Sequence, residues 1–334
     1  MQSLNQDRNT QSILRDSFGR QINYLRLAVT DRCNLTCRYC RPRNTGSPKA
    51  ALLSYDELLR LVRVFASLGI SKVRLTGGEP FARTGFIGLV KEISKISGIN
   101  NVCITTNGTL CFDHIKELKK NGVSGLNFSL DTLSPERFRQ ITGADLFHEA
   151  FASIMEAVLQ GIKVKVNVVV LDALNTDELL HLAGLAENLP IEVRFIEPMH
   201  FNGRKNFTTS TWTISSLARF FREKIPGCTE ALSASPSTAR LFTARNYQGR
   251  IGVIGGHSRT FCHTCNKVRV TPLGMMKTCL YDKEVLDLKK MLRAGYADQA
   301  LVRAIHDTVQ KKAASGTEAA SGADATCSMA LIGG

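Results

Sequence analysis

Three cysteines lie close together near the start of the chain, at Cys33, Cys37 and Cys40. They follow an alternating, β-rich run at residues 24–29, which predicts a strand that ends just before them. Cysteine thiolates are the usual ligands of iron–sulfur clusters, and three of them leave one iron of a four-iron cubane open to a substrate or cofactor. Zinc is the alternative, but structural zinc sites have four ligands, and no fourth ligand follows closely here. The spacing therefore favours a cluster with one accessible iron.

A second group of three cysteines lies far along the chain. Cys262 and Cys265 form a C-x2-C pair, and Cys279 follows fourteen residues later. This spacing fits a second cluster with an open iron equally well as a zinc site with His257 or His263 as the fourth ligand. The sequence alone leaves both interpretations open, although the first cluster favours iron.

Two cations accompany the second group. Lys267 and Arg269 are separated by one residue, so on a strand they would face the same side. Cations beside a metal centre are well placed to bind phosphates or the edge of a purine. A solvated basic strand is the alternative for these two residues.

Length and composition limit the class of protein. The chain has 334 residues, a net charge of +14 and 43% hydrophobic residues, which suits one large α/β domain with an extension. The basic charge favours anionic partners, but scattered Lys and Arg argue against nucleic acid. We expect no membrane segment and no secretory signal. Clustered cysteines in such a chain indicate metal binding in a reducing compartment, so we expect a cytoplasmic protein.

Alternating strands and helices predict a parallel sheet. The expected strands are residues 24–29, 72–75, 102–105, 125–130, 164–170 and 191–196. The expected helices are one between a Ser54/Glu57 capping box and Gly69, one near 84–96, one at 113–120, one from Ser134-Pro135, one near 147–160 and one at 176–187. These six βα units are fewer than the eight of a closed barrel, so we expect an incomplete, laterally open barrel with active groups at the carboxyl ends of its strands.

The pattern changes near residue 200. We expect an N-terminal arm at 1–21, the partial barrel at 22–200, and a C-terminal α+β domain at 201–312 that covers the opening. The C-terminal domain should contain a helix at 214–223 and short strands at 240–243 and 250–254. Residues 313–334 are small and polar from Gly316, which predicts a mobile tail that ends in Gly333-Gly334.

The first cysteine motif resembles that of the radical S-adenosylmethionine (SAM) family. Its spacing matches, and the aromatic Tyr39 precedes the third cysteine. One βα unit later, Gly77-Gly78-Glu79-Pro80 resembles the motif that holds the amino group of SAM, where Glu79 could accept a hydrogen bond from the ammonium. The two motifs together are far more specific than either alone.

Further motifs resemble one branch, the GTP 3′,8-cyclase family of molybdenum cofactor biosynthesis (MoaA). They are residues 25–34, 74–80, 105–108, 127–131, 165–169, 194–197, the Phe261-Cys262-x-x-Cys265 stretch and the terminal Gly333-Gly334. The resemblance covers most of the chain, from about Ile22 to Val270 and again at the tail.

The resemblance implies a reaction and two cofactors. One [4Fe-4S] cluster would bind SAM and cleave it reductively, and the 5′-deoxyadenosyl radical would take a hydrogen from the ribose 3′ carbon of GTP. Attack on guanine carbon 8 would then give (8S)-3′,8-cyclo-7,8-dihydroguanosine 5′-triphosphate, the first step of the pathway. A second [4Fe-4S] cluster would face the guanine edge. The resemblance also implies a flavodoxin- or ferredoxin-type reductant and a downstream cyclic pyranopterin monophosphate synthase, and it is compatible with a homodimer.

The same resemblance implies roles for individual residues. It assigns the first cluster to Cys33, Cys37 and Cys40, the second to Cys262, Cys265 and Cys279, SAM binding to Tyr39, Gly78, Ser129 and Met199, GTP binding to Arg26, Arg74, Thr105, Lys165, Lys267 and Arg269, and catalytic roles to Arg26, Lys165, Arg269, Gly333 and Gly334. Several of these lie on or just past expected strands, where a triphosphate would need cations.

Two departures from the family pattern stand out. Arg41 occupies the position after the third cysteine where the family usually has Met, and it adds a charge near the first cluster. Lys267 stands where the family has the first Arg of an R-x-R motif, which keeps the charge but loses the planar fork. Two alternatives remain: another radical SAM enzyme with an auxiliary cluster, and a zinc-binding, basic nucleic-acid module.

Overall fold

The computed structural model describes residues 13–40, 51–198, 211–231, 238–256, 262–283, 285–320 and 332. Its strands are β1 (Tyr24–Ala28), β2 (Lys72–Thr76), β3 (Asn101–Thr106), β4 (Val123–Ser129), β5 (Lys163–Val169), β6 (Glu192–Ile196), β7 (Thr229–Ala231), β8 (Arg240–Thr243), β9 (Arg250–Ile254), β10 (Lys267–Val270), β11 (Met275–Lys277) and β12 (Leu286–Asp287). Its α-helices are α1 (Tyr55–Ser67), α2 (Phe86–Ser94), α3 (Ile115–Lys120), α4 (Pro135–Thr142), α5 (Phe147–Leu159), α6 (Leu179–Asn188), α7 (Ile214–Lys224), α8 (Leu288–Arg293), α9 (Asp298–Gln310) and α10 (Gly316–Ala320).

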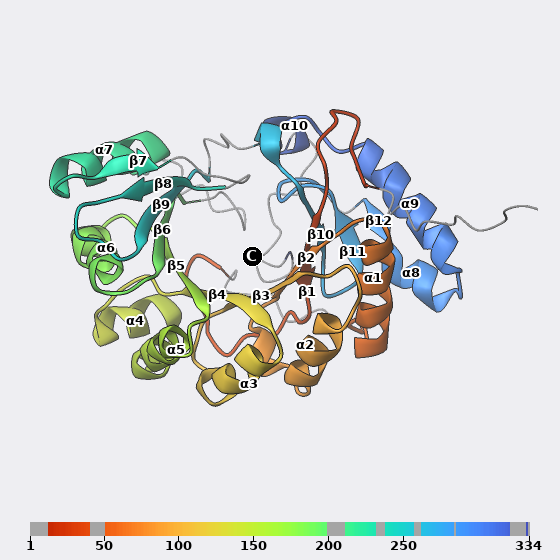
Figure 1. The fold of residues 1–334 in the computed structure, drawn as a ribbon, viewed down its shortest axis with the longest axis horizontal. Coiled ribbons are helices and arrows are strands. Elements are labelled where there is room, and N and C mark those ends of the chain that lie inside the picture. Colours follow the sequence, from red (N-terminus) through yellow and green to blue (C-terminus); the bar gives the residue numbers. More distant parts are fainter. Residues whose placement is uncertain are drawn as a thin grey trace, which may run out of the picture.

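Strands β1 to β6 form the parallel run that the sequence predicts. Each is hydrogen-bonded in parallel to the next, in chain order. Helices α1 to α6 lie on the outer, convex side of the curved sheet (Figure 1). The expected six βα units are therefore confirmed, and the carboxyl ends of the strands open toward one side, as in other α/β barrels.

The C-terminal part of the chain extends the same sheet at both edges. Strand β9 pairs in parallel with β6, and β10 pairs in parallel with β1. The two hairpin partners β8 and β11 then add antiparallel strands, so the twelve-stranded sheet runs β12-β11-β10-β1-β2-β3-β4-β5-β6-β9-β8-β7. Its end strands, β7 and β12, lie on opposite sides of the opening and are not paired with each other in the part of the chain that the structure describes (Figure 1). The sheet is therefore open, and the extension flanks the opening from both sides.

Local sequence signals explain the ends of several helices. Ser54 and Glu57 form the predicted capping box at the start of α1. The Ser134 hydroxyl accepts a hydrogen bond from the Arg137 amide at the start of α4, whose first residue is Pro135. Apolar side chains on the inner faces of these helices pack with the strands into one continuous core. This core holds the strand ends, and thus the site, in fixed positions.

Some sequence-based boundaries differ from the structure. The helix expected at 113–120 begins as a short 3-10 turn, η2 (Phe112–His114), before α3, and the one expected at 176–187 begins as η3 (Thr176–Glu178) before α6. The tail expected to be mobile from Gly316 instead starts with α10, and Ile332 is buried. The Gly316 amide at the start of α10 donates to the Cys262 sulfur, a distant partner that the small polar composition of this segment does not reveal. None of the helices within the described ranges is long and apolar enough to cross a bilayer.

Candidate active site

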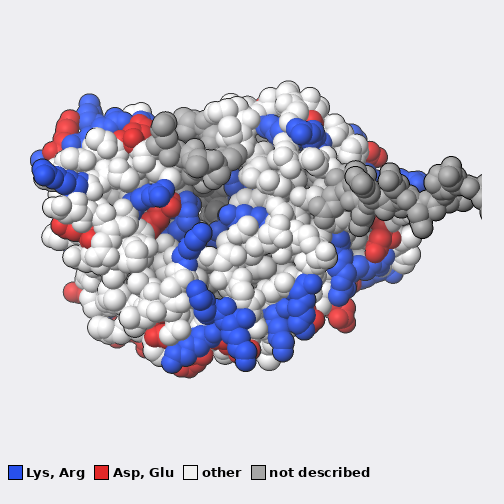
Figure 2. Space-filling model, in the orientation of Figure 1, with Lys and Arg blue, Asp and Glu red and all other residues white. Residues whose placement is uncertain are grey.

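A cavity of about 1130 Å³ lies inside the curve of the sheet, between its two flanks. Lys and Arg atoms gather around the hollow on the face that Figure 2 shows. The predicted site residues that line this cavity are Arg26, Cys33, Cys37, Tyr39, Cys40, Arg74, Gly78, Thr105, Ser129, Lys165, Cys262, Cys265, Lys267, Arg269 and Cys279. Met199, Gly333 and Gly334 lie outside the described residues, as do Arg41 and His257. The structure thus brings both cysteine groups, which are far apart in the sequence, and the predicted cationic and hydroxyl residues to one space.

The first cysteine loop follows β1 and is held by backbone hydrogen bonds to the end of α4. The Thr36 amide donates to the Thr142 carbonyl at 2.8 Å, and the Arg38 amide donates to the Ile141 carbonyl at 3.0 Å. Leu35 is buried beneath the loop. Contacts with α4, which follows β4, therefore help to fix the loop that carries the three thiols.

The glycine loop after β2 makes backbone hydrogen bonds to residues 30–32, the segment just before Cys33. The Gly78 amide donates to the Thr30 carbonyl at 2.8 Å, and the Glu79 amide donates to the Arg32 carbonyl at 2.7 Å. A Cβ on Gly78 would lie 2.2 Å from the Arg32 oxygen, so no larger residue fits without displacing backbone. Glycine is needed here because two backbone segments of the chain approach each other closely just before Cys33.

Glu79 serves this loop in a way that the sequence does not reveal. One carboxylate oxygen accepts hydrogen bonds from the Phe81 amide at 3.1 Å and the Thr106 hydroxyl at 2.9 Å. The other accepts from the Asn107 amide at 2.7 Å. Burial raises the pKa of Glu79 to about 7 despite these bonds. Glu79 is fully buried, and its carboxylate joins the glycine loop after β2 to the loop after β3.

The aromatic residue of the first motif is tied to an acid. The Tyr39 hydroxyl donates to Asp131 at 2.7 Å, and the other oxygen of Asp131 accepts from the Val169 amide at 2.8 Å. Burial raises the pKa of Asp131 to about 6. Burial also raises the pKa of Cys37 well above its usual value, and the neighbouring Cys40 and Asp131 raise it further.

The first triplet fits an iron–sulfur cluster by the chemistry of its donors. Its three thiols are half-buried, line the same cavity and are not in disulfides. The Cys33 sulfur accepts hydrogen bonds from the Leu35 amide at 3.4 Å and from the Asn107 side chain at 3.7 Å. Such N–H donors to sulfur are one means by which proteins stabilise cluster thiolates.

The second triplet lies on the opposite flank. Cys262 begins the 3-10 turn η5 (Cys262–Thr264), Cys265 precedes β10, and Cys279 follows β11. The Gly316 amide at the start of α10 donates to the Cys262 sulfur at 3.1 Å. Burial alone would raise the pKa of Cys265, but the charges of Lys312 and Lys267 outweigh it, and the net pKa is lowered. A thiol that ionises easily is suited to bind iron.

His263, offered above as a fourth zinc ligand, is exposed on η5. Among the residues that the structure describes, no group of three or more Cys, His, Asp or Glu side chains surrounds a single metal ion. In a cubane, by contrast, each thiolate binds a different iron.

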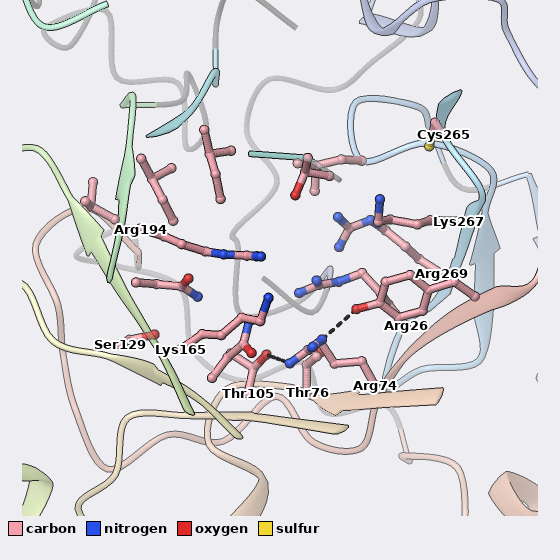
Figure 3. Close-up of a pocket in the computed structure, with 18 of the residues that line it drawn as sticks. Arg26, Arg74, Thr76, Thr105, Ser129, Lys165, Arg194, Cys265, Lys267 and Arg269 are labelled. Carbon is pink, nitrogen blue, oxygen red and sulfur yellow. Dashed lines mark hydrogen bonds between the residues drawn. The ribbon is translucent and has the colours of Figure 1, made fainter. Parts of the chain in front are cut away.

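Three adjacent strands supply one cationic wall of the cavity. In the sheet register, Arg269 of β10, Arg26 of β1 and Arg74 of β2 lie side by side. Residues two positions away on a strand face the same side, so Lys267 and Tyr24 join them. Figure 3 shows Arg26, Arg74, Lys267 and Arg269 pointing into the same space. Loss of hydration within the site and the charge of the neighbouring Arg269 lower the pKa of Arg26 to about 9.

Tyr24 is a functional candidate that the motifs of the sequence do not include. The Arg74 Nε donates to the Tyr24 hydroxyl at 2.6 Å, and the Nζ atoms of Lys72 and Lys267 lie 4.8 and 5.6 Å from its ring centre. Burial alone would raise the pKa of Tyr24, but the charges of Arg74 and Arg26 outweigh it and lower the pKa to about 7. Its place two residues before Arg26 on an expected strand was the only available signal.

The opposite wall comes from β5 and β6. Lys165 Nζ lies 3.0 Å from Glu192, which also pairs with Arg194. Burial and the charge of Arg194 lower the pKa of Lys165. Figure 3 shows Arg194 and Lys165 pointing across the cavity toward Arg26 and Arg269. Arg194 was recognised only as part of a family motif, and its place on the cavity wall is new.

Two hydroxyl residues complete the lining. The Thr105 hydroxyl accepts a hydrogen bond from Arg74 Nη1 at 3.4 Å, and the same nitrogen donates to the Ile104 carbonyl at 3.3 Å. Ser129 is the last residue of β4, and it lines the cavity. The cavity thus holds a cysteine group on each side and cations between them.

Comparison with known proteins supports this arrangement. Residues 27–186 match the family model described as Radical SAM superfamily, and residues 191–317 match the one described as Molybdenum Cofactor Synthesis C. The chain is 40% identical over 303 residues to a GTP 3′,8-cyclase of Clostridium perfringens, and the match covers 90% of this chain and 93% of that protein. It is also 40% identical over 304 residues to human Molybdenum cofactor biosynthesis protein 1, covering 90% of this chain and 48% of the human protein.

A solved structure shares the fold. SuiB of Streptococcus suis, bound to its precursor peptide SuiA, matches with a TM-score of 0.62 at 15% identity, over 86% of this chain and 68% of that chain. SuiB bound to S-adenosylmethionine matches with a TM-score of 0.58 at 15% identity, over 85% of this chain and 68% of that chain.

An open sheet with a parallel centre, a three-cysteine loop after its first strand β1 and a glycine loop after β2 are typical of the radical SAM class of enzymes, to which this chain belongs. Within that class, the chain belongs to the GTP 3′,8-cyclase family of molybdenum cofactor biosynthesis. Its members are lyases that use SAM and two [4Fe-4S] clusters to cyclise GTP. The assignment decides against the alternative of a zinc-binding nucleic-acid module.

Proposed function

We propose that this chain cyclises GTP to (8S)-3′,8-cyclo-7,8-dihydroguanosine 5′-triphosphate, with its two cysteine triplets holding different partners across one cavity. Cys33, Cys37 and Cys40 would hold the cluster that binds SAM. Cys262, Cys265 and Cys279 would hold the cluster on the GTP side. The observation that carries the proposal is the convergence of both triplets on a single cation-lined cavity of about 1130 Å³.

Cys33, Cys37 and Cys40 would hold a cluster that could supply the electron for reductive cleavage of SAM, the reaction that would start hydrogen abstraction from the ribose 3′ carbon of GTP. The chain's own residues bind and orient the reactants. Tyr39, Gly78, Ser129 and Met199 are proposed to contact SAM. The Tyr39 ring is fixed by its bond to Asp131, and Gly78 lines the same cavity as the first triplet, so the methionine part of SAM could lie between them.

The cations would hold the triphosphate. Arg26, Arg74, Thr105, Lys165, Lys267 and Arg269 are proposed to contact GTP, and Arg194 joins them as an addition from the structure. One guanidinium group can donate two hydrogen bonds to two oxygens of a phosphate. Several such groups together can neutralise the charge of a triphosphate. Because these side chains come from β10, β1, β2, β3, β5 and β6, the rigid sheet fixes the nucleotide relative to both clusters.

The residues proposed as catalytic are Arg26, Lys165, Arg269, Gly333 and Gly334. The first three would position the nucleotide and stabilise its charge. For the two glycines the support is indirect: Ala313 to Gly316 line the cavity, and Ile332, next to Gly333, is buried. Removal of both glycines should leave iron content and SAM cleavage intact while cyclisation is lost. Normal turnover by the truncated protein would refute this role.

We further propose a division into an arm (1–21), the partial barrel (22–200), the second-cluster domain (201–312) and the tail (313–334). A cytoplasmic location, a flavodoxin- or ferredoxin-type reductant, a downstream cyclic pyranopterin monophosphate synthase and a homodimer are proposals of the same kind. Their support is the family assignment and the reducing conditions that clustered free thiols need.

The experiment that tests the function is an anaerobic incubation of the reconstituted protein with SAM, a strong reductant and GTP. We expect 5′-deoxyadenosine and the cyclised nucleotide in equal amounts. Use of GTP deuterated at the ribose 3′ carbon should transfer the deuterium to 5′-deoxyadenosine. SAM cleavage that is unaffected by GTP, with no cyclised product, would contradict the proposal and favour another radical SAM reaction.

A further inference from the structure

Two buried cations outside both cysteine motifs contact the main chain around the second triplet. The first is Arg20, near the end of the predicted N-terminal arm. Its Nη1 donates to the Cys262 carbonyl at 2.9 Å and to the Ala314 carbonyl at 2.9 Å. Its Nη2 donates to the Ala313 carbonyl at 2.6 Å. One guanidinium therefore joins the start of the chain, the second cysteine loop and the root of the C-terminal tail.

Arg20 is itself held in a fixed orientation. Its Nε lies 2.5 Å from Asp16, whose side chain is fully buried while that of Arg20 is 8% exposed. The same carboxylate accepts hydrogen bonds from the Phe18 amide at 3.0 Å and the Arg20 amide at 2.9 Å. Because Asp16 binds the Nε edge, the terminal nitrogens remain directed at the three carbonyls. The planar fork of arginine makes this possible, and a lysine ammonium could not reproduce it.

The second cation is Lys312, just beyond α9 and only 3% exposed. Its Nζ donates to the Lys267 carbonyl at 3.2 Å and also to the Thr278 carbonyl. Lys267 lies two residues after Cys265, and Thr278 lies just before Cys279. Between them, Arg20 and Lys312 thus contact the main chain at or near each of the three cysteines.

These contacts matter because the three cysteines lie on separate segments with little regular structure of their own. Cys262 and Cys265 belong to a short turn and the link to β10, and Cys279 lies in the turn after β11. The carbonyls that bind Lys312 are neutral, so they do not cancel its charge, whereas the charge of Arg20 is balanced by Asp16. Both side chains fix the segments that carry the thiols, which is how outer contacts commonly support metal ligands.

We propose that Arg20 and Lys312 are positioning residues that lock the three segments of the second cysteine site and the root of the tail into one frame. The Asp16–Arg20 turn then has a function at the second site, although it precedes the matched Radical SAM region at residues 27–186. The inference rests on the proposed function only in taking this triplet as a cluster site.

The first test separates the two sites by mutation. A full-length variant with Cys33, Cys37 and Cys40 replaced by alanine keeps only the second site, and one with Cys262, Cys265 and Cys279 replaced keeps only the first. Each should bind about four irons after anaerobic reconstitution. Arg20→Lys, Arg20→Met and Lys312→Met are then added to each. We expect chelator-driven iron loss to become at least about tenfold faster in the second-site protein and to stay unchanged in the first-site protein.

Matched controls lie beside each cation. Arg15 is exposed in the same turn, where its side chain donates to the Gly19 carbonyl at 3.1 Å, and Lys311 is the exposed neighbour of Lys312. Arg15→Met and Lys311→Met should leave both iron-loss rates unchanged. Equal acceleration of iron loss at both sites, or none at either, would overturn the proposal, because a general loss of stability cannot distinguish the two triplets.

The second test does not depend on clusters. In the metal-free, full-length wild-type protein, hydrogen exchange should show protection of the Gly316 amide and of residues 262–266. Arg20→Lys should speed exchange of these segments by about tenfold or more, because charge-assisted bonds to three carbonyls are lost or weakened. Unchanged exchange would overturn the positioning role. If the wild type instead binds no second cluster, the proposed function fails while the exchange result still decides the role of Arg20.

Discussion

The two cysteine sites face the same cavity but have opposite electrostatic surroundings. Around the first triplet, burial and the neighbouring Cys40 and Asp131 raise the pKa of Cys37 well above its usual value. Around the second, Lys312 and Lys267 lower the pKa of Cys265 even though burial opposes them. The first site is braced by backbone from α4 and the glycine loop, whereas the second is braced by cationic side chains from both ends of the chain.

We infer that this difference lets one cavity distinguish between GTP and SAM, the two molecules proposed to bind in it. A polyanion is attracted to the flank where Lys267, Arg269 and Lys312 gather, whereas the first site has a tyrosine tied to an acid. The overall charge of +14 predicted an anionic partner, and part of that charge lines the cavity. We infer that the electrostatic contrast directs GTP and SAM to opposite sides.

The largest expected effect comes from removing either triplet. Replacement of Cys33, Cys37 and Cys40 should abolish both SAM cleavage and cyclisation, because electrons can no longer reach SAM. Replacement of Cys262, Cys265 and Cys279 should abolish cyclisation yet leave slow, uncoupled formation of 5′-deoxyadenosine. Product analysis by liquid chromatography checks both. If the second replacement also stopped SAM cleavage while the first site kept its iron, the two sites would not be separable.

The next largest effect should come from the close backbone contact between Gly78 and Arg32, next to the first site. A Cβ at Gly78 would lie 2.2 Å from the Arg32 carbonyl oxygen, so Gly78→Ala must displace the segment before Cys33. We expect a loss of about 1–3 kcal/mol in the free energy of unfolding and at least about a tenfold loss of SAM cleavage. Denaturant unfolding and single-turnover assays measure these.

Gly88 offers the control for that variant. It lies in α2, and a Cβ added there would meet no atom of the described residues within 4 Å. Gly88→Ala should therefore be neutral or stabilise the helix by up to about 1 kcal/mol. Equal losses in the two alanine variants would show that close approach at Gly78 is unimportant.

A smaller effect should separate the two cations of β10. Arg269→Lys removes the planar fork, so GTP should bind about tenfold to a hundredfold more weakly at neutral pH, with SAM binding unchanged. Lys267→Arg should bind GTP at least as well as the wild type. Burial lowers the pKa of Lys267 to about 8, so the wild type loses this charge above that pH and the arginine variant keeps it. Calorimetry across pH measures both, and identical responses of the two variants would contradict distinct roles.

The smallest expected effect is a pH dependence of GTP affinity that originates at Tyr24. Its pKa is lowered to about 7 by the surrounding cations, so the phenolate forms above that pH in the free protein. Bound phosphates repel the phenolate and raise its pKa, so GTP binding takes up a proton, and affinity falls as pH rises through about 7. Between about pH 6.5 and 8 the decrease should reach up to about eightfold. Tyr24→Phe should remove it, and a variant with the same slope as wild type would contradict this origin.

The free energy of unfolding should rise with pH, whereas the affinity for GTP should fall. The pKa of Tyr24 is depressed in the folded protein from its ordinary value of 10.0 to about 7, so its contribution is fully present above the ordinary value and is lost as pH falls through the lowered one. Denaturant unfolding between about pH 7 and 9 should show a gain in the wild type that is absent in Tyr24→Phe. Equal gains in the two proteins would assign the effect to other groups.

Local sequence patterns predicted the parts of the fold that local interactions determine. The six alternating βα units, the Ser54/Glu57 capping box and strands β8 and β9 follow from periodicity and caps. The pairing of Arg26 with Arg269 does not, because the two strands are separated by most of the chain and nothing in either stretch encodes its neighbour. The helix α10 was missed for the same reason: Cys262, which accepts from its first amide, and Arg20, which binds Ala314 just before it, lie far away in sequence.

In the candidate site too, local sequence patterns predicted some residues, whereas others depend on tertiary contacts. Motif spacing identified the cysteines, and alternation on a strand correctly indicated that Lys267 and Arg269 share a face. Tyr24 and Arg20 could not be identified, because their importance depends on which distant groups fold against them. Glu79 was placed near SAM by its motif, but its burial against Thr106 and the Asn107 amide is a tertiary feature.

Electron paramagnetic resonance of the two single-site proteins tests the central contrast most directly. Each protein is reduced anaerobically and titrated with GTP and, separately, with SAM. We predict that GTP changes the spectrum only of the protein that keeps Cys262, Cys265 and Cys279, and that SAM changes only that of the protein that keeps Cys33, Cys37 and Cys40. A GTP-induced change at the first triplet, or none at the second, would contradict the account.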